Sequence, residues 1–408
     1  MKIYLVGGAV RDHLLGLTPK EKDWVVVGAT PNQLVSMGFR QVGKDFPVFL
    51  HPKTHEEYAL ARTERKTGSG YYGFECQFDP TVTLEQDLLR RDLTINAMAM
   101  DEKGHLIDPY QGQRDVENKI LRHVSPAFVE DPIRVLRVAR FLARYHYLGF
   151  RIADETRLFM YQMVQRKELH HIVAERMWQE WQRSLGEQNP EQFILALRTC
   201  GALSVLLPEI DNLFGIPNSR KYHPEIDTGI HVLMALQAVV RLSERLPVRF
   251  AVLLHDVGKA LTPMVLWPKH PDHEQLGVSV LESLCQRLRV PSEYKDLACV
   301  VACYHLTIHR VLELKPDTIV SVLEKIDAFR RPQRFFDILL ACEADAQGCG
   351  EAERAYPQRA IWHALYNRCA EVQAQNLMMP GMHGLEIKQA IHQARIQAVK
   401  DFWKTYEK

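Results

Sequence analysis

The sequence predicts an α+β protein, in which strands and helices share the N-terminal part and helices alone make up the rest. Short apolar or alternating segments, each ended by glycine, proline or a charged cluster, indicate sheet strands at 2–6, 24–27, 47–50 and 58–62. From about residue 115, apolar side chains recur at helical spacing instead, as at Met177, Trp181 and Leu185. We therefore expect a mixed sheet with helices, then a helical region, then a second helical domain, over 1–115, 116–225 and 226–408.

Composition indicates an ordinary globular protein without a membrane span. The chain has 408 residues, of which 46% are hydrophobic and 25% charged, and this is enough for two or three domains with buried cores. No apolar run approaches the length of a transmembrane helix, and the N-terminus shows no export signal. The formal net charge of +1 argues against binding a polyanion over the whole surface, but it allows local basic patches.

The cysteine pattern favours a reducing compartment. The eight cysteines form no CxxC pair, and Cys299 and Cys303, which lie four residues apart, have no second pair to complete a zinc site. Scattered thiols of this kind are typical of proteins kept reduced in the cytoplasm, where we expect this chain to act.

Two neighbouring features near the N-terminus indicate a nucleoside triphosphate site. Gly7 and Gly8 follow the first predicted strand and open a helix. Such a pair is most often only a turn, but glycines at a helix start also let backbone N–H groups approach a phosphate, where the helix dipole favours negative charge. Glu21 and Asp23 then lead into the next strand. Because carboxylates two residues apart on an extended segment point to the same side, both can ligate one Mg²⁺.

The order and spacing of these residues, with Arg11 after the glycines, resemble the signature of the tRNA nucleotidyltransferase and poly(A) polymerase family. The resemblance implies a polymerase-β-like nucleotidyltransferase domain over 1–115, with Gly8 and Arg11 in contact with the nucleotide. One departure concerns the first carboxylate, which is usually Asp in the family and is Glu21 in this chain. Its extra methylene moves the carboxylate oxygens, so Asp23 is the safer metal ligand.

Further segments match motifs of the same family. The resemblance implies that Arg91 contacts the triphosphate, while Asp92 and Asn96 organise the sugar and the site. Segment 108–123 matches a motif that joins the catalytic region to the neck. The glycine-rich and aromatic segment 66–74 corresponds to a family loop that takes part in switching between nucleotides, although a plain hairpin connection fits its residues equally well.

The segment after Glu130 carries the most specific pattern. Pro132 suits the first turn of a helix, along which four arginines then recur on one stripe: Arg134, Arg137, Arg140 and Arg144. Apolar residues fill the opposite side and should pack into the core. An arginine row is ordinarily a solvated face, but no acidic residue lies at i+4 to pair these arginines within the helix. The family resemblance implies that Arg137 and Arg140 bind nucleotide.

Asp131 and Arg134 form an acid–base pair with a specific chemical use. A carboxylate accepts from an exocyclic amine, and a guanidinium donates to a ring nitrogen or carbonyl. Cytosine and adenine both present an amine beside an acceptor, whereas uracil and guanine present the reverse. The pair can therefore select CTP and ATP without a nucleic-acid template, with roughly 1–3 kcal/mol of discrimination for each good bidentate contact. It also matches the Glu-Asp-x-x-Arg motif that serves as the protein template in the family.

Together these assignments predict magnesium-dependent nucleotidyl transfer to RNA. Metal held by Asp23 and Glu21 would activate the RNA 3′-hydroxyl, which attacks the α-phosphorus while the arginines stabilise the leaving pyrophosphate. The helical region over 116–225 resembles the neck and body of the family, which is expected to carry the acceptor stem of tRNA. The resemblance thus implies addition of CCA to the 3′ end of tRNA from CTP and ATP.

The C-terminal part holds a second constellation. His231 precedes the His-Asp-x-Gly-Lys run at 255–259, and His273 and His305 lie further along the chain. A single histidine is usually a satisfied surface or core residue, but a His-Asp pair with an upstream histidine partner is more specific. Imidazole and carboxylate ligands suit a divalent transition metal or Mg²⁺, and a water bound to such a metal can attack a phosphate.

This pattern resembles the HD phosphohydrolase superfamily. The resemblance implies a catalytic pair of His255 and Asp256 and a metal site that these two residues share with His231. The site is closed by an aspartate on a later helix, for which Asp345 is the first choice and Asp327 the second. Bacterial enzymes with both parts resemble the multifunctional CCA-adding proteins, whose HD domain has phosphatase, 2′-nucleotidase and 2′,3′-cyclic phosphodiesterase activity. We expect Ni²⁺, Mn²⁺ or Mg²⁺ at this site.

Two other interpretations stay open at this point. A bacterial poly(A) polymerase shares the N-terminal signatures, but those polymerases usually carry a long basic C-terminal extension, and this chain ends soon after Ile387. Alternatively, the chain is only an HD phosphohydrolase whose N-terminal half has become an RNA-binding module, for which Glu21 is the sole indication. The sequence also leaves open whether the chain is a monomer or a homodimer, and whether it builds the whole CCA end alone.

Overall fold

The computed structural model describes residues 1–19, 21–42, 48–66, 74–219, 227–348, 355–377 and 382–406. The side chains of 64–66 and 74–76 lie outside this description. The chain forms two compact units, unit 1 (Met1–Leu206) and unit 2 (Leu207–Lys408). The three-domain division expected from the sequence stays a prediction. Within the described residues, no helix combines the length and the apolar character needed to cross a membrane.

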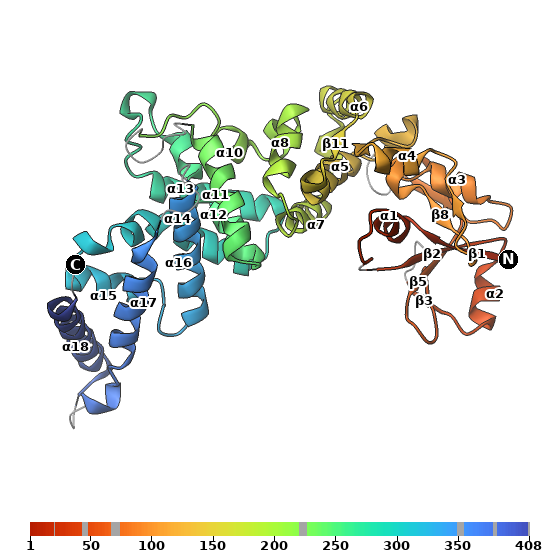
Figure 1. Ribbon diagram of the computed structural model, residues 1–408. Coiled ribbons are helices and arrows are strands. Elements are labelled where there is room, and N and C mark those ends of the chain that lie inside the picture. The colour runs from red at the N-terminus through yellow and green to blue at the C-terminus, as the bar shows by residue number, and fades with distance from the viewer. Residues whose placement is uncertain are drawn as a thin grey trace. The chain divides into compact units, whose positions relative to one another are not determined.

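Unit 1 is built on a seven-stranded mixed sheet with the strand order β3-β4-β5-β2-β1-β8-β9 (Figure 1). Its strands are β1 (Lys2–Val6), β2 (Asp23–Val27), β3 (Arg40–Val42), β4 (Val48–Leu50), β5 (Glu57–Leu60), β8 (Ala99–Met100) and β9 (Leu106–Ile107). The neighbours β2 and β5 run parallel, and the other pairs in this sheet are antiparallel. Four of these strands match the predicted ones, and the predicted mixed sheet is confirmed.

Both faces of the sheet are covered. Alternation along β2 places Val25 in one apolar cluster, to which α3 (Leu84–Leu89) contributes Leu88, and Val26 in another. The second cluster includes Leu34 of α2 (Pro31–Ser36). Sheet register also places the functional residues: Val6 pairs with Asp23, so the start of α1 (Gly8–Leu14) lies beside the first residue of β2.

Gly7 makes this arrangement possible. Its φ of +67° is a conformation that residues with a side chain rarely adopt. A Cβ at this position would also lie 2.7 Å from Nη1 of Arg91. The predicted glycine turn into a helix is therefore present, and it lets an arginine approach the backbone closely.

The segment between Lys66 and Phe74, which was expected to be a functional loop or a hairpin connection, has residues 67–73 outside the described part of the chain. The flanking strands β6 (Thr63–Lys66) and β7 (Phe74–Gln77) pair with each other as an antiparallel ribbon. The role of the loop in nucleotide switching stays a prediction.

The rest of unit 1 is mainly helical. Its elements are η1 (Thr94–Asn96), α4 (Gly112–Glu117), β10 (Ile120–Leu121), η2 (Pro126–Glu130), α5 (Ile133–Tyr145), η3 (His146–Leu148), β11 (Arg151–Ile152), α6 (Asp154–Gln165), η4 (Glu168–His171), α7 (Ala174–Leu185), α8 (Glu191–Thr199) and α9 (Ala202–Leu206). Helix α5 carries the arginine row and packs against α7 and α8. As predicted, its opposite side is core, because Val135, Leu136 and Val138 are fully buried.

Unit 2 is helical. Its elements are α10 (Pro208–Asp211), α11 (Thr228–Leu242), α12 (Leu246–Leu254), η5 (Val257–Leu261), η6 (Met264–Leu266), α13 (His273–Leu288), α14 (Ser292–His309), η7 (Val311–Glu313), α15 (Pro316–Lys325), α16 (Pro332–Gln347), α17 (Pro357–Ala370), η8 (Ala374–Asn376) and α18 (Gly384–Thr405). Helices α11, α12, α14 and α16 pack together, and η5 lies against α13. Gly258 permits that approach, since a Cβ there would collide with the carbonyl oxygen of His273.

Candidate active sites

A single cavity of about 790 Å³ in unit 1 gathers every residue that the sequence assigns to nucleotide or magnesium binding. These residues come from α1, β2, η1, α5 and the segments beside them: Gly8, Arg11, Glu21, Asp23, Arg91, Asp92, Asn96, Asp131, Arg134, Arg137 and Arg140. The first of them is Gly8 and the last is Arg140, so tertiary folding rather than local sequence brings them together.

The two carboxylates expected to hold magnesium lie at one part of this cavity. Burial raises the pKa of Asp23, the charge of Arg91 lowers it, and the charge of Glu21 raises it again. The pKa of Asp23 is raised overall, which means that its ionised form is electrostatically unfavourable here. A divalent cation bound at the carboxylates would offset this cost. Carboxylate oxygens are also the donors that Mg²⁺ prefers, so these residues fit the ion.

Arg11 is fixed by a buried hydrogen-bond network. Its guanidinium donates to Asp12 Oδ1 at 2.8 and 2.9 Å and to Asn96 Oδ1 at 2.5 Å. The hydroxyl of Tyr145, at the end of α5, also donates to Asp12 Oδ1, at 2.9 Å. The network therefore ties α1, which begins beside the carboxylates, to the helix that carries the arginine row.

Asp92 joins the same network to the arginine row. It accepts from Asn96 Nδ2 at 2.9 Å and from Arg137 Nε at 2.7 Å. Burial alone would raise the pKa of Asp92, but the charge of Arg137 and these hydrogen bonds outweigh burial and hold the pKa well below its usual range. Asp92 is therefore ionised, and it holds Asn96 and Arg137 in place beside the cavity.

Arg140 is buried and pairs with Glu180 of α7, whose Oε2 lies 2.7 Å from Arg140 Nε. Glu180 also lies 3.7 Å from Arg137. The arginine row therefore has acidic partners, although none of them lies four residues further along the same helix. The partners come from other segments of unit 1: Asp92, which precedes η1, pairs with Arg137, Asp12 of α1 with Arg144, and Glu180 of α7 with Arg140.

The predicted base-reading pair is present in the cavity, but the two residues do not contact each other through their side chains. Asp131 is paired with Arg176 of α7 at 2.9 and 3.3 Å. Arg134 donates to the backbone carbonyl oxygens of Arg90 at 2.6 Å and Ala127 at 2.9 Å. Both residues still line the cavity.

Sequence analysis missed the contribution of α7. Arg176, Glu180 and Arg183 recur four and three residues apart, which places a charged stripe on one face of this helix. Arg176 and Arg183 line the cavity that holds the arginine row, and Glu180 contacts Arg137 of that row. The signal that could have found them is this alternation of charge, which complements a row of arginines on another helix.

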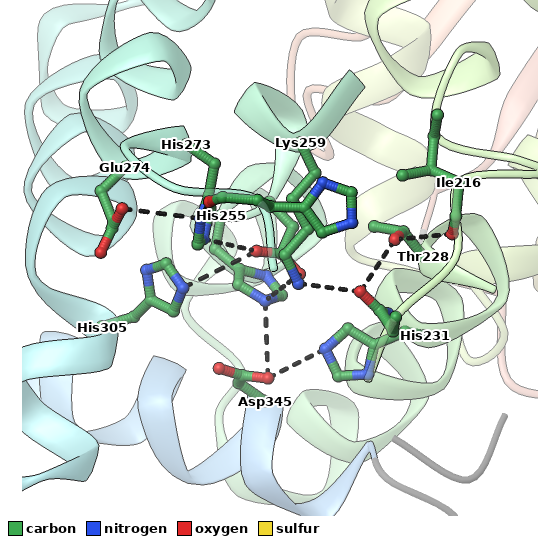
Figure 2. Close-up of polar contacts among 12 residues, drawn as sticks. Ile216, Thr228, His231, His255, Lys259, His273, Glu274, His305 and Asp345 are labelled. Atoms are coloured by element: carbon green, nitrogen blue, oxygen red, sulfur yellow. Dashed lines mark hydrogen bonds and ion pairs between the residues drawn. The ribbon is translucent and has the colours of Figure 1, made fainter. Parts of the chain in front are cut away.

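The second site, in unit 2, is a cluster of buried histidines and aspartates. Potential metal-ligand atoms lie within 4.8 Å of one another in three groups, which are His231–His255–Asp256, His255–His305–Asp345 and Asp256–His273–His305. Figure 2 shows how His231, His255 and Asp345 converge from α11, the end of α12 and α16. Sequence analysis noted His273 and His305 but did not assign them to the metal site.

Of the two aspartates proposed to close this site, the structure places Asp345 in it. Asp345 Oδ1 lies 2.9 Å from His231 Nε2 and 3.5 Å from His255 Nε2. Asp327 instead lies beyond the end of α15, where it pairs with Arg330 and Arg331 at 3.8 and 3.5 Å.

The electrostatics of the cluster also fit a cation. Burial alone would lower the pKa of His255, but the carboxylates of Asp256 and Asp345 raise it to about 10. Asp256 Oδ1 and His273 Nε2 are both buried and lie 3.4 Å apart, but among the described groups neither atom has a hydrogen-bond partner. Uncompensated buried donors and acceptors are costly, and a nitrogen and oxygen donor set of this kind suits a divalent transition metal.

Lys259 is a further residue that sequence analysis quoted without a role. Its ammonium group donates to Asp256 Oδ2 at 2.7 Å and to Asn218 Oδ1 at 3.0 Å, and it lines a cavity of about 730 Å³ beside His255. A buried cation at the wall of this cavity favours an anionic ligand such as a phosphate ester.

Comparison with known families matches three segments of the chain. The family model described as "Poly A polymerase head domain" matches residues 3–122. The model described as "Probable RNA and SrmB- binding site of polymerase A" matches 149–214, and that described as "HD domain" matches 228–331.

Relatives of known name match along the whole chain. A "Multifunctional CCA protein" of Legionella pneumophila strain Paris is 62% identical over 411 residues, covering 100% of both chains. One of Thioalkalivibrio sulfidiphilus is 58% identical and covers 98% of both chains. The chain belongs to the multifunctional CCA protein family. In this chain, the cavity of unit 1 is lined by residues of the head segment, by residues of the RNA-binding segment, and by Asp131 and the arginine row, which lie between these two segments. The histidine cluster falls mostly in the HD segment.

Solved structures of CCA-adding enzymes have a fold similar to that of this member of the multifunctional CCA protein family. An apo CCA-adding enzyme gives a TM-score of 0.66 at 17% identity, covering 99% of this chain and 92% of that one. The Bacillus stearothermophilus CCA-adding enzyme in complex with CTP gives 0.62 at 23% identity, covering 98% and 89%. The predicted α+β class, with a nucleotidyltransferase head and a helical HD region, is thereby confirmed.

Proposed function

We propose that the chain adds the nucleotides C, C and A to the 3′ end of tRNA, using CTP and ATP and releasing pyrophosphate. The observation that carries this proposal is the single cavity in which two carboxylates, a glycine-led helix start and the arginine row meet. Full-length relatives named multifunctional CCA protein and the CTP-bound structure of a CCA-adding enzyme support it.

The residues of this cavity divide the work. Glu21 and Asp23 would hold Mg²⁺, which when bound supplies charge neutralisation at the phosphates and favours the 3′-hydroxyl as nucleophile. Arg11 and Arg91 bind the triphosphate, and an arginine beside the departing pyrophosphate stabilises its charge. Asp131 accepts from the amine of cytosine or adenine, and Arg134 donates to the adjacent ring acceptor.

The RNA partner is the acceptor stem and 3′ end of tRNA. The RNA-binding segment at 149–214 and the structure of a Thermotoga maritima CCA-adding enzyme complexed with tRNA support this assignment. The place of action is the cytoplasm, which the free thiols of the described cysteines favour.

Unit 2 is a metal-dependent phosphohydrolase. His231, His255, Asp256 and Asp345 would hold a divalent transition metal or Mg²⁺, and the metal when bound activates a water for attack on phosphorus. Lys259 binds the phosphate oxygens at the wall of the adjoining cavity. Phosphate monoesters and 2′,3′-cyclic phosphates are the expected substrates.

Product sequencing tests the proposal directly. Purified protein is incubated with Mg²⁺, CTP, ATP and a tRNA transcript that ends at the discriminator base. Addition of C, C and A followed by a stop supports CCA synthesis, whereas a run of adenosines would identify a poly(A) polymerase. Phosphate release without nucleotide addition would instead leave only the HD phosphohydrolase.

A further inference from the structure

His309, the last residue of α14, lies beside the histidine cluster of unit 2 without belonging to any of the three potential ligand groups. Its Nε2 is 2.7 Å from Oδ2 of Asp345, and its Nδ1 is 2.9 Å from the hydroxyl of Tyr356. Residues 309 and 356 line the same cavity as His255. Three residues far apart in sequence, Tyr356, His309 and Asp345, thus form one hydrogen-bonded chain that ends at the site.

The direction of each hydrogen bond follows from the chemistry of the groups. An ionised carboxylate only accepts, so His309 Nε2 is the donor to Asp345. A neutral imidazole that donates through one nitrogen accepts through the other. Nδ1 is then the acceptor, and the hydroxyl of Tyr356, 2.9 Å away, is its donor. Tyr356 therefore selects the tautomer of His309 that donates to Asp345.

The two oxygens of Asp345 face different neighbours. Oδ2 accepts from His309, whereas Oδ1 lies 2.9 Å from His231 and 3.5 Å from His255. The side chain of His309 is 22% exposed, while that of His231 is fully buried and that of His255 is 2% exposed. His309 therefore lies at the edge of the site and binds Oδ2 of Asp345, while Oδ1 stays directed at His231 and His255.

Two side chains of α17 donate hydrogen bonds to the end of α14, next to this hydrogen-bonded chain of residues. Trp362 Nε1 donates to the carbonyl oxygen of Ile308 at 2.9 Å, and Gln358 Nε2 donates to that of His309 at 3.4 Å. The segment matched by the HD model ends at residue 331. Both Asp345 and Tyr356 lie beyond it, so the site is completed by helices outside the matched segment.

We propose that His309, oriented by Tyr356, is a positioning residue that fixes the Asp345 carboxylate for metal binding in unit 2. The inference rests on the phosphohydrolase function proposed above. Hydrogen-bond partners behind a ligand typically change metal affinity or activity by roughly 10- to 100-fold when they are removed. His309 is expected to fall in that range, and Tyr356, which acts one step further out, to have a smaller effect.

The test is a titration of the full-length protein with Co²⁺, followed by visible absorption, which reports on the ligand geometry as well as on affinity. Co²⁺ binds a site with nitrogen ligands in preference to a carboxylate pair such as that of unit 1. The variant His255→Ala then identifies the signal that belongs to unit 2. The variants are His309→Leu, His309→Gln and Tyr356→Phe. Glutamine retains an N–H donor, and phenylalanine retains the ring without the hydroxyl. Thermal unfolding of each variant is recorded alongside.

The proposal predicts that His309→Leu weakens Co²⁺ binding by roughly 10- to 100-fold. His309→Gln should recover most of this loss, and Tyr356→Phe should lose several-fold affinity with an unfolding temperature close to that of the unmodified protein. Unchanged affinity and spectrum in His309→Leu, or equal losses in the leucine and glutamine variants, would overturn it. If the unmodified protein gave no His255-dependent signal, the proposed phosphohydrolase function itself would fail.

Discussion

The carboxylate of Asp131 is paired with Arg176, with Oδ2 2.9 Å from Nη2 and Oδ1 3.3 Å from Nη1, and not with Arg134 three residues along the chain. A guanidinium on both oxygens limits the rotation of the carboxylate. A carboxylate in a fixed orientation can accept from the amine of cytosine or adenine and repels the carbonyl of uracil or guanine. In the function proposed above, base selection would therefore depend on a residue of α7 as well as on the motif itself.

The first prediction concerns this choice of base. Asp131→Asn places an amide, which both donates and accepts, where only an acceptor stood. We expect the preference for CTP and ATP over UTP and GTP to fall by about 10- to 100-fold, the equivalent of one bidentate contact. The measurement is kcat/KM for each of the four nucleoside triphosphates on a tRNA transcript.

The adjacent Glu130→Gln is the matched control, because it removes a carboxylate of the same motif that does not line the cavity. It should keep the preference of the unmodified protein. An Asp131→Asn variant that still rejects UTP and GTP would show that another group reads the base.

The sequence was sufficient to predict the residues of unit 1 that belong to one local motif each. Gly8, Glu21 and Asp23 follow from the strand-turn-helix pattern, and the arginine row follows from helical periodicity. The partners of that row could not be predicted in the same way. Glu180 and Arg176 lie on a separate helix, and only tertiary packing brings α7 against α5.

The same limit applies to unit 2. His255 and Asp256 are adjacent in sequence and were identified together, whereas the choice between Asp345 and Asp327 needed the packing of α16 against α11 and α12. His309 gave no sequence signal, since a lone histidine at a helix end has many possible roles. Its function depends on Tyr356, whose position is set by a different helix.

The second prediction concerns the magnesium ligands. Asp23→Ala should abolish nucleotide addition and leave phosphate-ester hydrolysis intact, because the two activities belong to separate units. Glu21→Asp should raise the turnover of nucleotide addition, since the shorter side chain restores the ligand that is usual in the family. Single-turnover rates of CMP addition measure both effects.

Glu102→Asp, an equally conservative change at an exposed position, controls for a general effect of shortening a glutamate. A rate for Glu21→Asp equal to or below that of the unmodified protein would contradict the geometric argument. Normal addition by Asp23→Ala would remove Asp23 from the metal site.

The third prediction separates the two candidate aspartates of unit 2. Asp345→Asn should reduce hydrolysis of a 2′,3′-cyclic nucleotide by more than the roughly 10- to 100-fold that is typical for residues behind a ligand. Asp327→Asn is a closely matched control, because Asp327 adopts a φ of +58° that asparagine also tolerates. It should leave hydrolysis unchanged, and a comparable loss in both variants would contradict the assignment of Asp345.

The last prediction concerns the acid stability of unit 1. The pKa of Asp92 is held well below its usual range in the folded chain by the charge of Arg137 and by hydrogen bonds, despite the opposing effect of burial. A carboxyl whose pKa is lower in the folded than in the unfolded state stabilises the fold at neutral pH. This contribution is lost as the pH falls below the unfolded value of about 3.9 toward the folded one.

Asp92→Asn should therefore lower the free energy of unfolding by about 2 kcal/mol at pH 7, because it removes a buried carboxylate that accepts from Arg137, a partly exposed arginine whose main counter-charge it is. The difference from the unmodified protein should shrink as the pH is lowered from 5 to 3, since Asp92 then takes up a proton in the unfolded chain but stays ionised in the folded one. Urea unfolding followed by tryptophan fluorescence measures it, with the exposed Asp154→Asn as control. A constant difference across this pH range would mean that Asp92 acts through packing rather than through its charge.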